Sequence, residues 1–176
     1  KDSYRLAAHH IEQARSPHAG QEDSIRDDFL AAINSASIIK NNDFAFVDFS
    51  NLQLHNQQLS AAYFEYANLS SCQISDCDLS DAIFCHAIIK DTQFVDCNLK
   101  QANFGALELV NCQFINCDLT SATFSKSNIK DSQFKKCNMT KNQEMFLQTR
   151  FKNSQFINSD MAESIFMDAD ISHCDF

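Results

Sequence analysis

The residues of this chain best suited to chemistry are its eight cysteines. Cys72 and Cys77, and likewise Cys112 and Cys117, are separated by four residues, and closely spaced thiolates bind zinc in many proteins. Seven of the eight, however, occupy a repeating slot that Ala, Ser and Thr also occupy. This interchange favours buried free thiols that pack as small apolar groups. We therefore expect no metal, no cofactor and a reducing, cytoplasmic location, with secretion as an effector as the alternative.

Catalytic groups do not converge in this sequence. Cys85 precedes His86, but outward neighbours on such a strand diverge, so the pair does not form a nucleophile with its base. Asp76 and Asp78 have the spacing of a carboxylate pair, which repeats also produce for solubility alone. The sequence has no glycine-rich phosphate loop and no His-x-x-x-His pair. We expect that the protein is not an enzyme.

The pattern that positions these residues has a period of five. A large apolar residue stands at every fifth position from Phe44 to Met139, and the period resumes from Phe151 to Phe176. The residue two positions earlier is usually small. A period of five fits neither a helix nor a flat strand. The sequence therefore predicts an internal repeat in which one large and one small side chain per five residues point inward.

Four such units make a turn of twenty residues. At this step Leu79 and Leu99 fall in one column, and Phe84 and Phe104 fall in the next. Hydrogen bonding would hold successive turns about 4.8 Å apart, as in a β-sheet. The predicted fold is a four-sided coil with a column of stacked side chains as its core, stabilised by contacts between neighbouring turns.

The repeat units carry a family resemblance. Cys77-Asp78-Leu79-Ser80-Asp81 and Ala102-Asn103-Phe104 resemble the A(D/N)LXX pattern of pentapeptide-repeat proteins. The resemblance extends over residues 42–140 and 149–176. It implies an all-β solenoid, a right-handed quadrilateral β-helix. It implies little about activity, because the same coil carries many roles.

We divide the chain into a helical N-terminal cap (1–41), a β-helix (42–140), an irregular insertion (141–150) and C-terminal repeats (151–176). Helical spacing predicts one helix from about Tyr4 and a second from about Asp23 to Ala36, and the pair would cover the first turn's open edge. Two extra residues after Met139 predict an outward bulge. The end at Phe176 shows no cap, which predicts either a longer chain or a homodimer joined there.

Outward apolar residues are the candidate binding site for another protein, because contiguous exposed apolar groups often mark partner contacts. They form two groups in neighbouring turns of the predicted coil. The candidates are Tyr63, Ile83, Ile88, Val95, Val110 and Ile115.

The net charge of −9 argues against direct binding of nucleic acid, which needs a basic surface. The sequence has no run of about 18 apolar residues, so we expect no membrane span. An acidic rod could instead imitate nucleic acid, as family members that protect DNA gyrase from quinolones look to do. Their dimerising C-terminal helix has no match here, and interspersed lysines dilute the acidic surface. The acidic candidates are Asp76, Asp78, Asp81, Asp91 and Asp96.

The function that we expect is a non-enzymatic scaffold that presents a rigid surface to another protein, which by family analogy is a bacterial adaptor or effector module. The first alternative is an acidic DNA mimic that modulates DNA gyrase or topoisomerase. The second is a structural rod that assembles end to end through Phe176.

Overall fold

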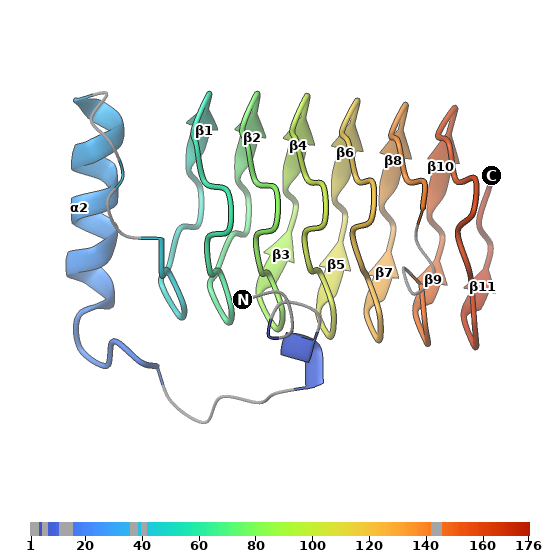
Figure 1. The fold of residues 1–176 in the computed structure, drawn as a ribbon, viewed down its shortest axis with the longest axis horizontal. Helices are drawn as coiled ribbons and strands as arrows, with labels where there is room; N and C mark the ends of the chain where they lie inside the picture. The colour runs from blue at the N-terminus through green and yellow to red at the C-terminus, as the bar shows by residue number, and fades with distance from the viewer. Residues whose placement is uncertain (1–3, 5–6, 11–15, 36–38, 40–41, 142–145) are drawn as a thin grey trace.

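The computed structural model describes residues 4, 7–10, 16–35, 39, 42–141 and 146–176. These residues form a four-sided β-solenoid with one α-helix at its N-terminal end (Figure 1). The predicted solenoid is therefore confirmed. Each turn advances the chain by twenty residues, so that Phe94 pairs in register with Phe114.

Two adjacent sides of the coil are parallel β-sheets of three-residue strands. The β1 face is the six-stranded sheet of β1 (Gln53–His55), β2 (Gln73–Ser75), β4 (Gln93–Val95), β6 (Gln113–Ile115), β8 (Gln133–Lys135) and β10 (Gln155–Ile157). The β3 face is the five-stranded sheet of β3 (Ile88–Lys90), β5 (Glu108–Val110), β7 (Asn128–Lys130), β9 (Arg150–Lys152) and β11 (Asp170–Ser172).

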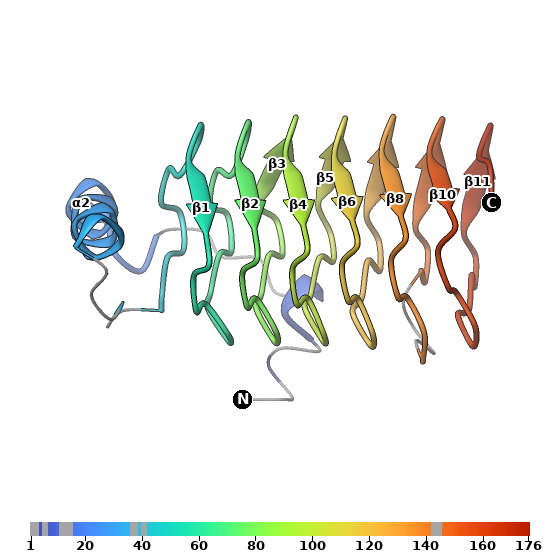
Figure 2. The same cartoon turned by 90° about the horizontal axis from the view of Figure 1, so that it is seen from above.

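The other two sides pair through isolated bridges rather than through strands. We call them the Asp78 face, where Asp78 bridges to Asn98, and the Tyr63 face, where Tyr63 bridges to Ile83. Along the chain each turn visits the β1, Asp78, Tyr63 and β3 faces in this order, so the Tyr63 face lies opposite the β1 face. Figure 2 shows the turns from a second side.

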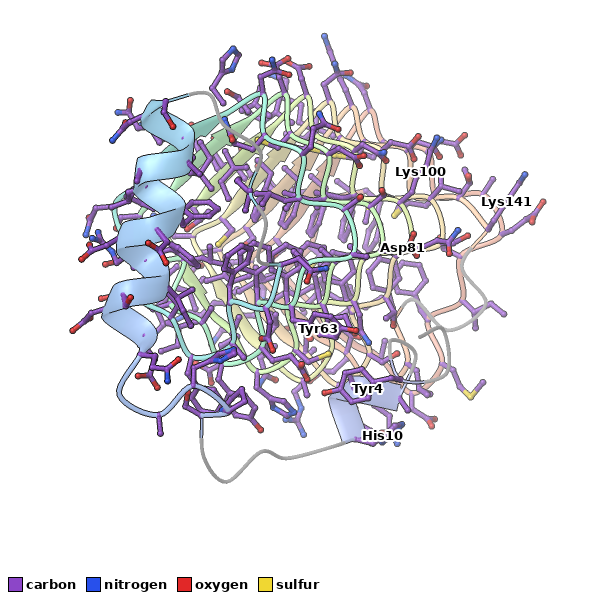
Figure 3. The ribbon with its side chains drawn as sticks, turned by 60° about the vertical axis from the view of Figure 1, so that its left-hand side comes forward. Tyr4, His10, Tyr63, Asp81, Lys100 and Lys141 are labelled. Atoms are coloured by element: carbon purple, nitrogen blue, oxygen red, sulfur yellow. The ribbon has the colours of Figure 1, made fainter. Side chains whose placement is uncertain are left out.

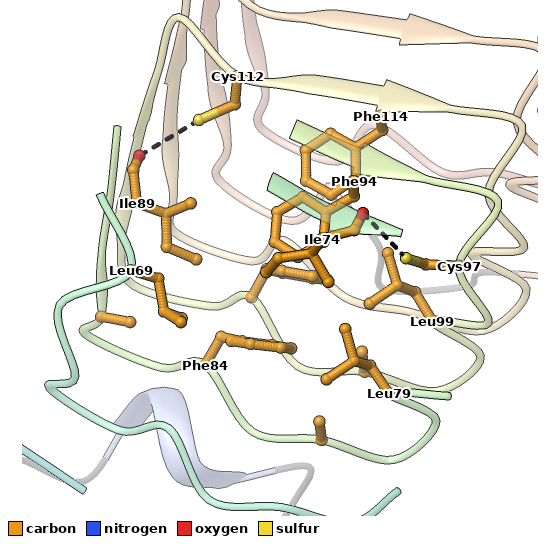
Figure 4. Close-up of a cluster of buried hydrophobic side chains, with 14 of the residues drawn as sticks. Leu69, Ile74, Leu79, Phe84, Ile89, Phe94, Cys97, Leu99, Cys112 and Phe114 are labelled. Carbon is orange, nitrogen blue, oxygen red and sulfur yellow. Dashed lines mark hydrogen bonds between the residues drawn. The ribbon is translucent and has the colours of Figure 1, made fainter. Parts of the chain in front are cut away.

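Stacked aromatic rings fill the core. Phe104 stacks on Phe84 and Phe124 with ring centroids 4.7 and 4.9 Å apart, and meets Phe114 edge-on at 5.7 Å. Offset-stacked and edge-to-face contacts are the arrangements that aromatic rings favour. Leu and Ile side chains pack with these rings in the core (Figure 4). Each turn is thus held mainly by the turns on either side.

The small inward slots hold hydrogen-bond donors. The thiol of Cys97 donates to the carbonyl of Ile74 at 3.5 Å, and the hydroxyl of Thr92 donates to the carbonyl of Leu69 at 2.7 Å (Figure 4 shows the first). All eight cysteines are free, and every one except Cys174 is buried. The prediction of buried free thiols is confirmed for six of the seven cysteines in the repeating slot, whereas Cys174 is half-buried.

The corners need no glycine. Every fifth residue from Phe46 to Lys141, and again from Gln148 to His173, has φ between 51° and 65°, and none of these residues is glycine. Such left-handed residues cost about 1–2 kcal/mol each. Backbone hydrogen bonds between turns oppose this cost: the N–H of Phe46, for example, donates to the carbonyl of Glu65 at 2.9 Å.

The helix α2 (Glu22–Asn34) caps the first turn, close to the predicted second helix. Phe29, its buried residue, contacts the rings of Phe44 and Phe49 at centroid distances of 5.2 and 4.8 Å. The expectation of two capping helices is wrong for the first segment. Tyr4 and Ala7 are α-helical, as predicted, and Ala8–His10 form the 3-10 helix η1. The segment, however, lies beside the coil rather than over its end (Figure 1, Figure 2).

The insertion is shorter than predicted. Phe146 belongs to the core and stacks on Phe166 at 4.6 Å, and β8 pairs with β10 at a step of twenty-two residues instead of twenty. The two extra residues therefore leave the register of the faces intact. The predicted bulge at 141–144 lies, apart from Lys141, outside the described residues.

Candidate functional site

The Tyr63 face is covered by a segment from outside the coil. We call this segment the N-terminal strap; its described residues are Tyr4 and residues 7–10. Ala8 is fully buried and clusters with Ile83 and Cys85, while Tyr4 and Tyr63 pack at the margin of this cluster. The ring centroids of Tyr4 and Tyr63 are 6.1 Å apart (Figure 3). The outer side of the coil thus binds a chain segment within the same molecule.

Polar contacts hold the described residues of the strap at Tyr4 and at His10. The hydroxyl of Tyr4 donates to Oε1 of Glu65 at 2.8 Å, and Nζ of Lys126 donates to Nδ1 of His10 at 2.7 Å. Glu65 points outward from the coil but is only 2% exposed. Burial raises the pKa of Glu65, the nearby Asp43 acts in the same direction, and the hydrogen bond from Tyr4 opposes them.

The outward side chains of this face are small or apolar over several turns, which lets a segment lie close to the backbone. Asn103, Gly105, Thr123 and Ser125 are buried although they face away from the core. The amide N–H of Gly105 is bonded to the side chain of Asn103 at 2.9 Å, and the hydroxyls of Thr123 and Ser125 are 2.9 Å apart. These polar groups of the face are therefore hydrogen-bonded locally.

Two expectations about this face need correction. Ile83 was predicted to be exposed and is only 3% exposed, because Ala8 covers it; Tyr63 is half-buried for the same reason. Cys85 points away from the core as predicted, but it too lies beneath the strap. Burial, with the charge of Glu65 as a smaller contribution, raises the pKa of the Cys85 thiol.

The other apolar candidates lie on other faces. Ile88 begins β3 and is 47% exposed, the largest exposure among the six. Val95 and Ile115 pair across β4 and β6 and are half-buried, whereas Val110 lies on β5 in the other sheet. The structure therefore separates the six candidates into three places and does not join them into one patch.

A groove follows the corner between the Tyr63 face and the β3 face. Its volume is about 560 Å³, and we call it the Ala106 groove. Lys126, which contacts the strap, lies in its wall, as does the exposed Ile88. The lining includes Tyr66, His86, Ile88, Ala106, Glu108 and Lys126.

The acidic candidates are distributed over several corners and are diluted by amides. Asp91 accepts a hydrogen bond from Asn111 at 2.7 Å, and Asp78 accepts one from Asn98 at 2.9 Å. Asp96 is bonded to the side chain of Asn116. Asp76 and Asp96 share the corner between the β1 and Asp78 faces, Asp81 lies at the next corner, and Asp91 lies at the corner before the β1 face. They do not form one acidic stripe.

The described part of the chain also bears on two further classes of site. No group of three or more His, Cys, Asp or Glu side chains there could hold a metal ion. No helix within the described ranges is long and apolar enough to cross a membrane.

The strap, and the residues Glu65 and Lys126 that hold it, were not predicted from the sequence. The helical spacing of Tyr4 and Ala8 was noted, but it was assigned to the end of the coil. The sequence did contain a signal that a segment covers the side of the coil. It lies in the outward positions of the Tyr63 face, which are Ala45, Glu65, Cys85, Gly105 and Ser125 at steps of twenty. A run of mostly small residues at outward positions is unusual for a solvated face and indicates a covered one.

Comparisons with known proteins establish the family. A family profile described as "Pentapeptide repeats (8 copies)" matches residues 62–101, and one described as "Pentapeptide repeat region" matches residues 107–176. The two matches cover more than half of the chain, which therefore belongs to the pentapeptide-repeat family. A search of curated proteins gives no match.

Three solved structures are similar to this chain, and the first supports the fold. Rfr23, a pentapeptide repeat protein from the cyanobacterium Cyanothece 51142, is 17% identical, with 76% of this chain and 97% of that chain covered and a TM-score of 0.52. QnrB1, a plasmid-mediated fluoroquinolone resistance protein, is 18% identical, with 71% and 72% covered and a TM-score of 0.39. HetL from Nostoc sp. strain PCC 7120, involved in heterocyst differentiation regulation, is 12% identical, with 81% and 92% covered and a TM-score of 0.28. At these identities the likeness concerns the fold alone.

Proposed function

We propose that this protein is a non-enzymatic interaction scaffold, and that its Tyr63 face binds a segment of a partner protein in place of the N-terminal strap. The observation that carries the proposal is the burial of Ala8, Ile83 and Cys85 against one another on the outside of the coil. A surface that buries a segment of its own chain has the shape and polarity to bind a similar segment in trans.

The rigidity of the coil favours this role. A core of stacked rings and turns bonded on both sides changes little on binding, so that association loses little conformational entropy in the scaffold. The strap competes with the partner for the face. Apparent affinity therefore depends on how often the strap is displaced.

The acidic mimic is an outcome of the test rather than part of the proposal, and the self-assembling rod is not part of it either. Alternation of Asp with Asn along the corners, as at Asp91 and Asn111, gives a weaker field than a continuous acidic stripe. A mimic would lose its partner steeply as salt is raised, because screening removes long-range attraction between charges.

The test is capture of a partner from lysate by a matched pair of arginine variants. Ala8→Arg and Ile83→Arg each place a charge between strap and face and should release the strap, but only Ile83→Arg also damages the face. We expect Ala8→Arg to capture more partner than the unmodified chain and Ile83→Arg to capture less, at both low and high salt.

Three other outcomes would reject this proposal. Equal capture by all three proteins would exclude the Tyr63 face. Loss of capture on Ile115→Arg alone would place the partner on the β1 face. Capture that disappears at high salt and on substituting Asp76 and Asp96 by Asn would favour the mimic. Circular dichroism and thermal melting of each variant confirm that the coil is intact.

A further inference from the structure

An aromatic ladder along one corner of the coil stops at the Ala106 groove. Phe46 stacks on Tyr66 at a centroid distance of 4.6 Å with the rings 8° from parallel, and Tyr66 stacks on His86 at 4.8 Å and 15°. All three are corner residues with φ between 58° and 65°. The next residue in this column, twenty positions on, is Ala106, and Lys126 follows it.

Ala106 therefore leaves one rung of the ladder empty. Because each turn repeats the backbone of the one before, the space over Ala106 has the depth of one stacked ring, with His86 on one side and Lys126 on the other. All three residues line the groove of about 560 Å³. The groove is open at its surface, and the exposed side chain of Ile88 adds an apolar wall.

We propose that the Ala106 groove binds an aromatic side chain of the partner, which inserts between His86 and Lys126 as the missing rung. The inference rests on the proposed function, because it names what that partner brings. Stacking on His86 provides one contact, and the ammonium group of Lys126 favours the electron-rich face of a ring.

The chemistry of the groove selects an aromatic ring over other guests. An aliphatic side chain would contact Ile88 but would gain neither stacking nor a cation–π contact. A cationic guest side chain would be repelled, because Lys90 and Lys126 outnumber Glu108 in the lining of the groove. Nε2 of His86 is also buried without a hydrogen-bond partner in the ranges that the structure describes, so a polar group beside the guest ring would have a use there.

The groove adjoins the strap. Lys126 bonds to His10 of the strap and also lines the groove, so a partner segment that replaces the strap on the Tyr63 face passes beside the empty rung. One partner can therefore contact both the flat face and the groove. The groove then adds selectivity for a segment with an aromatic residue at the matching position.

The probe that tests this inference is N-acetyl-tyrosine amide, with N-acetyl-leucine amide as the aliphatic comparison. Each is titrated into the full chain while the methyl signal of Ala106 and the ring signals of His86 are followed by NMR. We expect a saturable shift of the Ala106 methyl to lower frequency with the tyrosine probe, because a ring stacked over a methyl group shields it. The leucine probe should cause no comparable shift.

Variants with a matched control locate the site. Ala106→Phe fills the rung from within and should abolish probe binding, as followed on His86; the column already holds Phe46 at φ 65°, so the corner accepts this residue. Ala61→Phe places the same side chain at a corner of another column, where φ is 56°, and should leave probe binding unchanged. Lys126→Gln should weaken binding about two- to fivefold through loss of the cation–π contact.

Equal shifts with the two probes, or probe binding that survives Ala106→Phe, would overturn the inference. Its failure is separable from failure of the proposed function. If partner capture changes with Ala8→Arg and Ile83→Arg as expected but the tyrosine probe does not bind, only the groove proposal is rejected. If the tyrosine probe binds but partner capture is the same with and without the strap variants, only the proposal for the Tyr63 face is rejected.

Discussion

The hydroxyl of Tyr4 donates a 2.8 Å hydrogen bond to Oε1 of Glu65, a residue sixty-one positions further along the chain. This bond joins the strap to a carboxyl group that is buried on the outside of the coil. Without the strap, Glu65 would be exposed to water and its carboxylate would have no desolvation penalty. The bond therefore belongs to the covered state of the face, and changes in it should alter how long the face stays covered.

Removing the hydroxyl should loosen the strap. Tyr4→Phe leaves Glu65 buried without this donor, and a hydrogen bond to a charged group contributes about 1.5–3 kcal/mol. Cys85 reports the opening, because it is fully buried beside Ala8 and reacts only when the strap lifts. We expect labelling of Cys85 by a thiol reagent to accelerate about tenfold or more, since 1.4 kcal/mol corresponds to a factor of ten.

Cys117 is the internal control for this measurement. It lies inside the coil, where lifting the strap does not reach it. Peptide mapping of the labelled protein separates the two thiols. Rapid labelling of Cys85 in the unmodified chain would contradict the covered state.

The strap should respond to pH in the direction set by Glu65. Burial raises the pKa of Glu65 above its ordinary value in the covered state, so the covered state prefers the protonated carboxyl. Its contribution is fully present below the ordinary pKa and is lost as pH rises through the raised pKa. The methyl signal of Ala8 should therefore shift toward its uncovered position as pH rises through this interval.

Glu65→Gln provides the control for this pH dependence. The amide is uncharged at every pH, so the Ala8 signal of this variant should not change over the same interval. Among the residues that the structure describes, the other titratable groups facing Glu65 are Tyr4, Asp43 and Cys85. The same pH response in the variant would assign the effect to one of these groups or to a group elsewhere.

The stacked core predicts unequal costs for the same substitution. Phe104 is fully buried between Phe84 and Phe124, and Phe104→Ala should lower the free energy of unfolding by about 3–5 kcal/mol. Phe176 is 62% exposed and stacks on one side only, on Phe156. Phe176→Ala should therefore cost a small fraction of this amount. Urea unfolding of both variants measures the difference, and equal losses would contradict the stacked core.

The inward donors predict a second contrast. The hydroxyl oxygen of Thr92 lies 2.7 and 2.9 Å from the carbonyl oxygens of Leu69 and Lys90, which share its single proton. Thr92→Val keeps the shape but leaves both carbonyls without this donor, and should cost about 1–3 kcal/mol in the free energy of unfolding. Thr92→Cys keeps a donor of the kind that Cys97 supplies in a neighbouring slot, and should cost less. Thermal unfolding that ranks the two variants in the opposite order would reject this role for the slot.

Much of the fold could be predicted from sequence because the core is periodic. The columns of Leu79 with Leu99 and of Phe84 with Phe104 required only counting, and the structure confirms the step of twenty residues. The free thiols could be predicted in the same way, because Cys interchanges with Ala, Ser and Thr in one slot of the repeat. Local repetition determines these features, so no knowledge of distant contacts was needed.

The candidate site could not be predicted in the same way because it depends on one long-range contact. Ile83 is an outward position by the repeat rule, and only the approach of Ala8 buries it. The repeat likewise gives no reason for Ala106 to interrupt the ladder of Phe46, Tyr66 and His86, and the resulting groove becomes visible only when the corners are stacked. Periodicity predicts the scaffold, whereas departures from it locate the candidate surface.

We propose that the Tyr63 face binds a chain segment and can exchange it. The most direct measurement is a titration of the isotope-labelled full chain carrying Ala8→Arg, whose own strap should be displaced, with an unlabelled peptide of residues 1–15. We expect saturable shifts in the amide signals of Tyr63, Ile83, Gly105 and Ser125, with the β1 face unaffected. Absence of binding, or shifts spread evenly over all four faces, would contradict it.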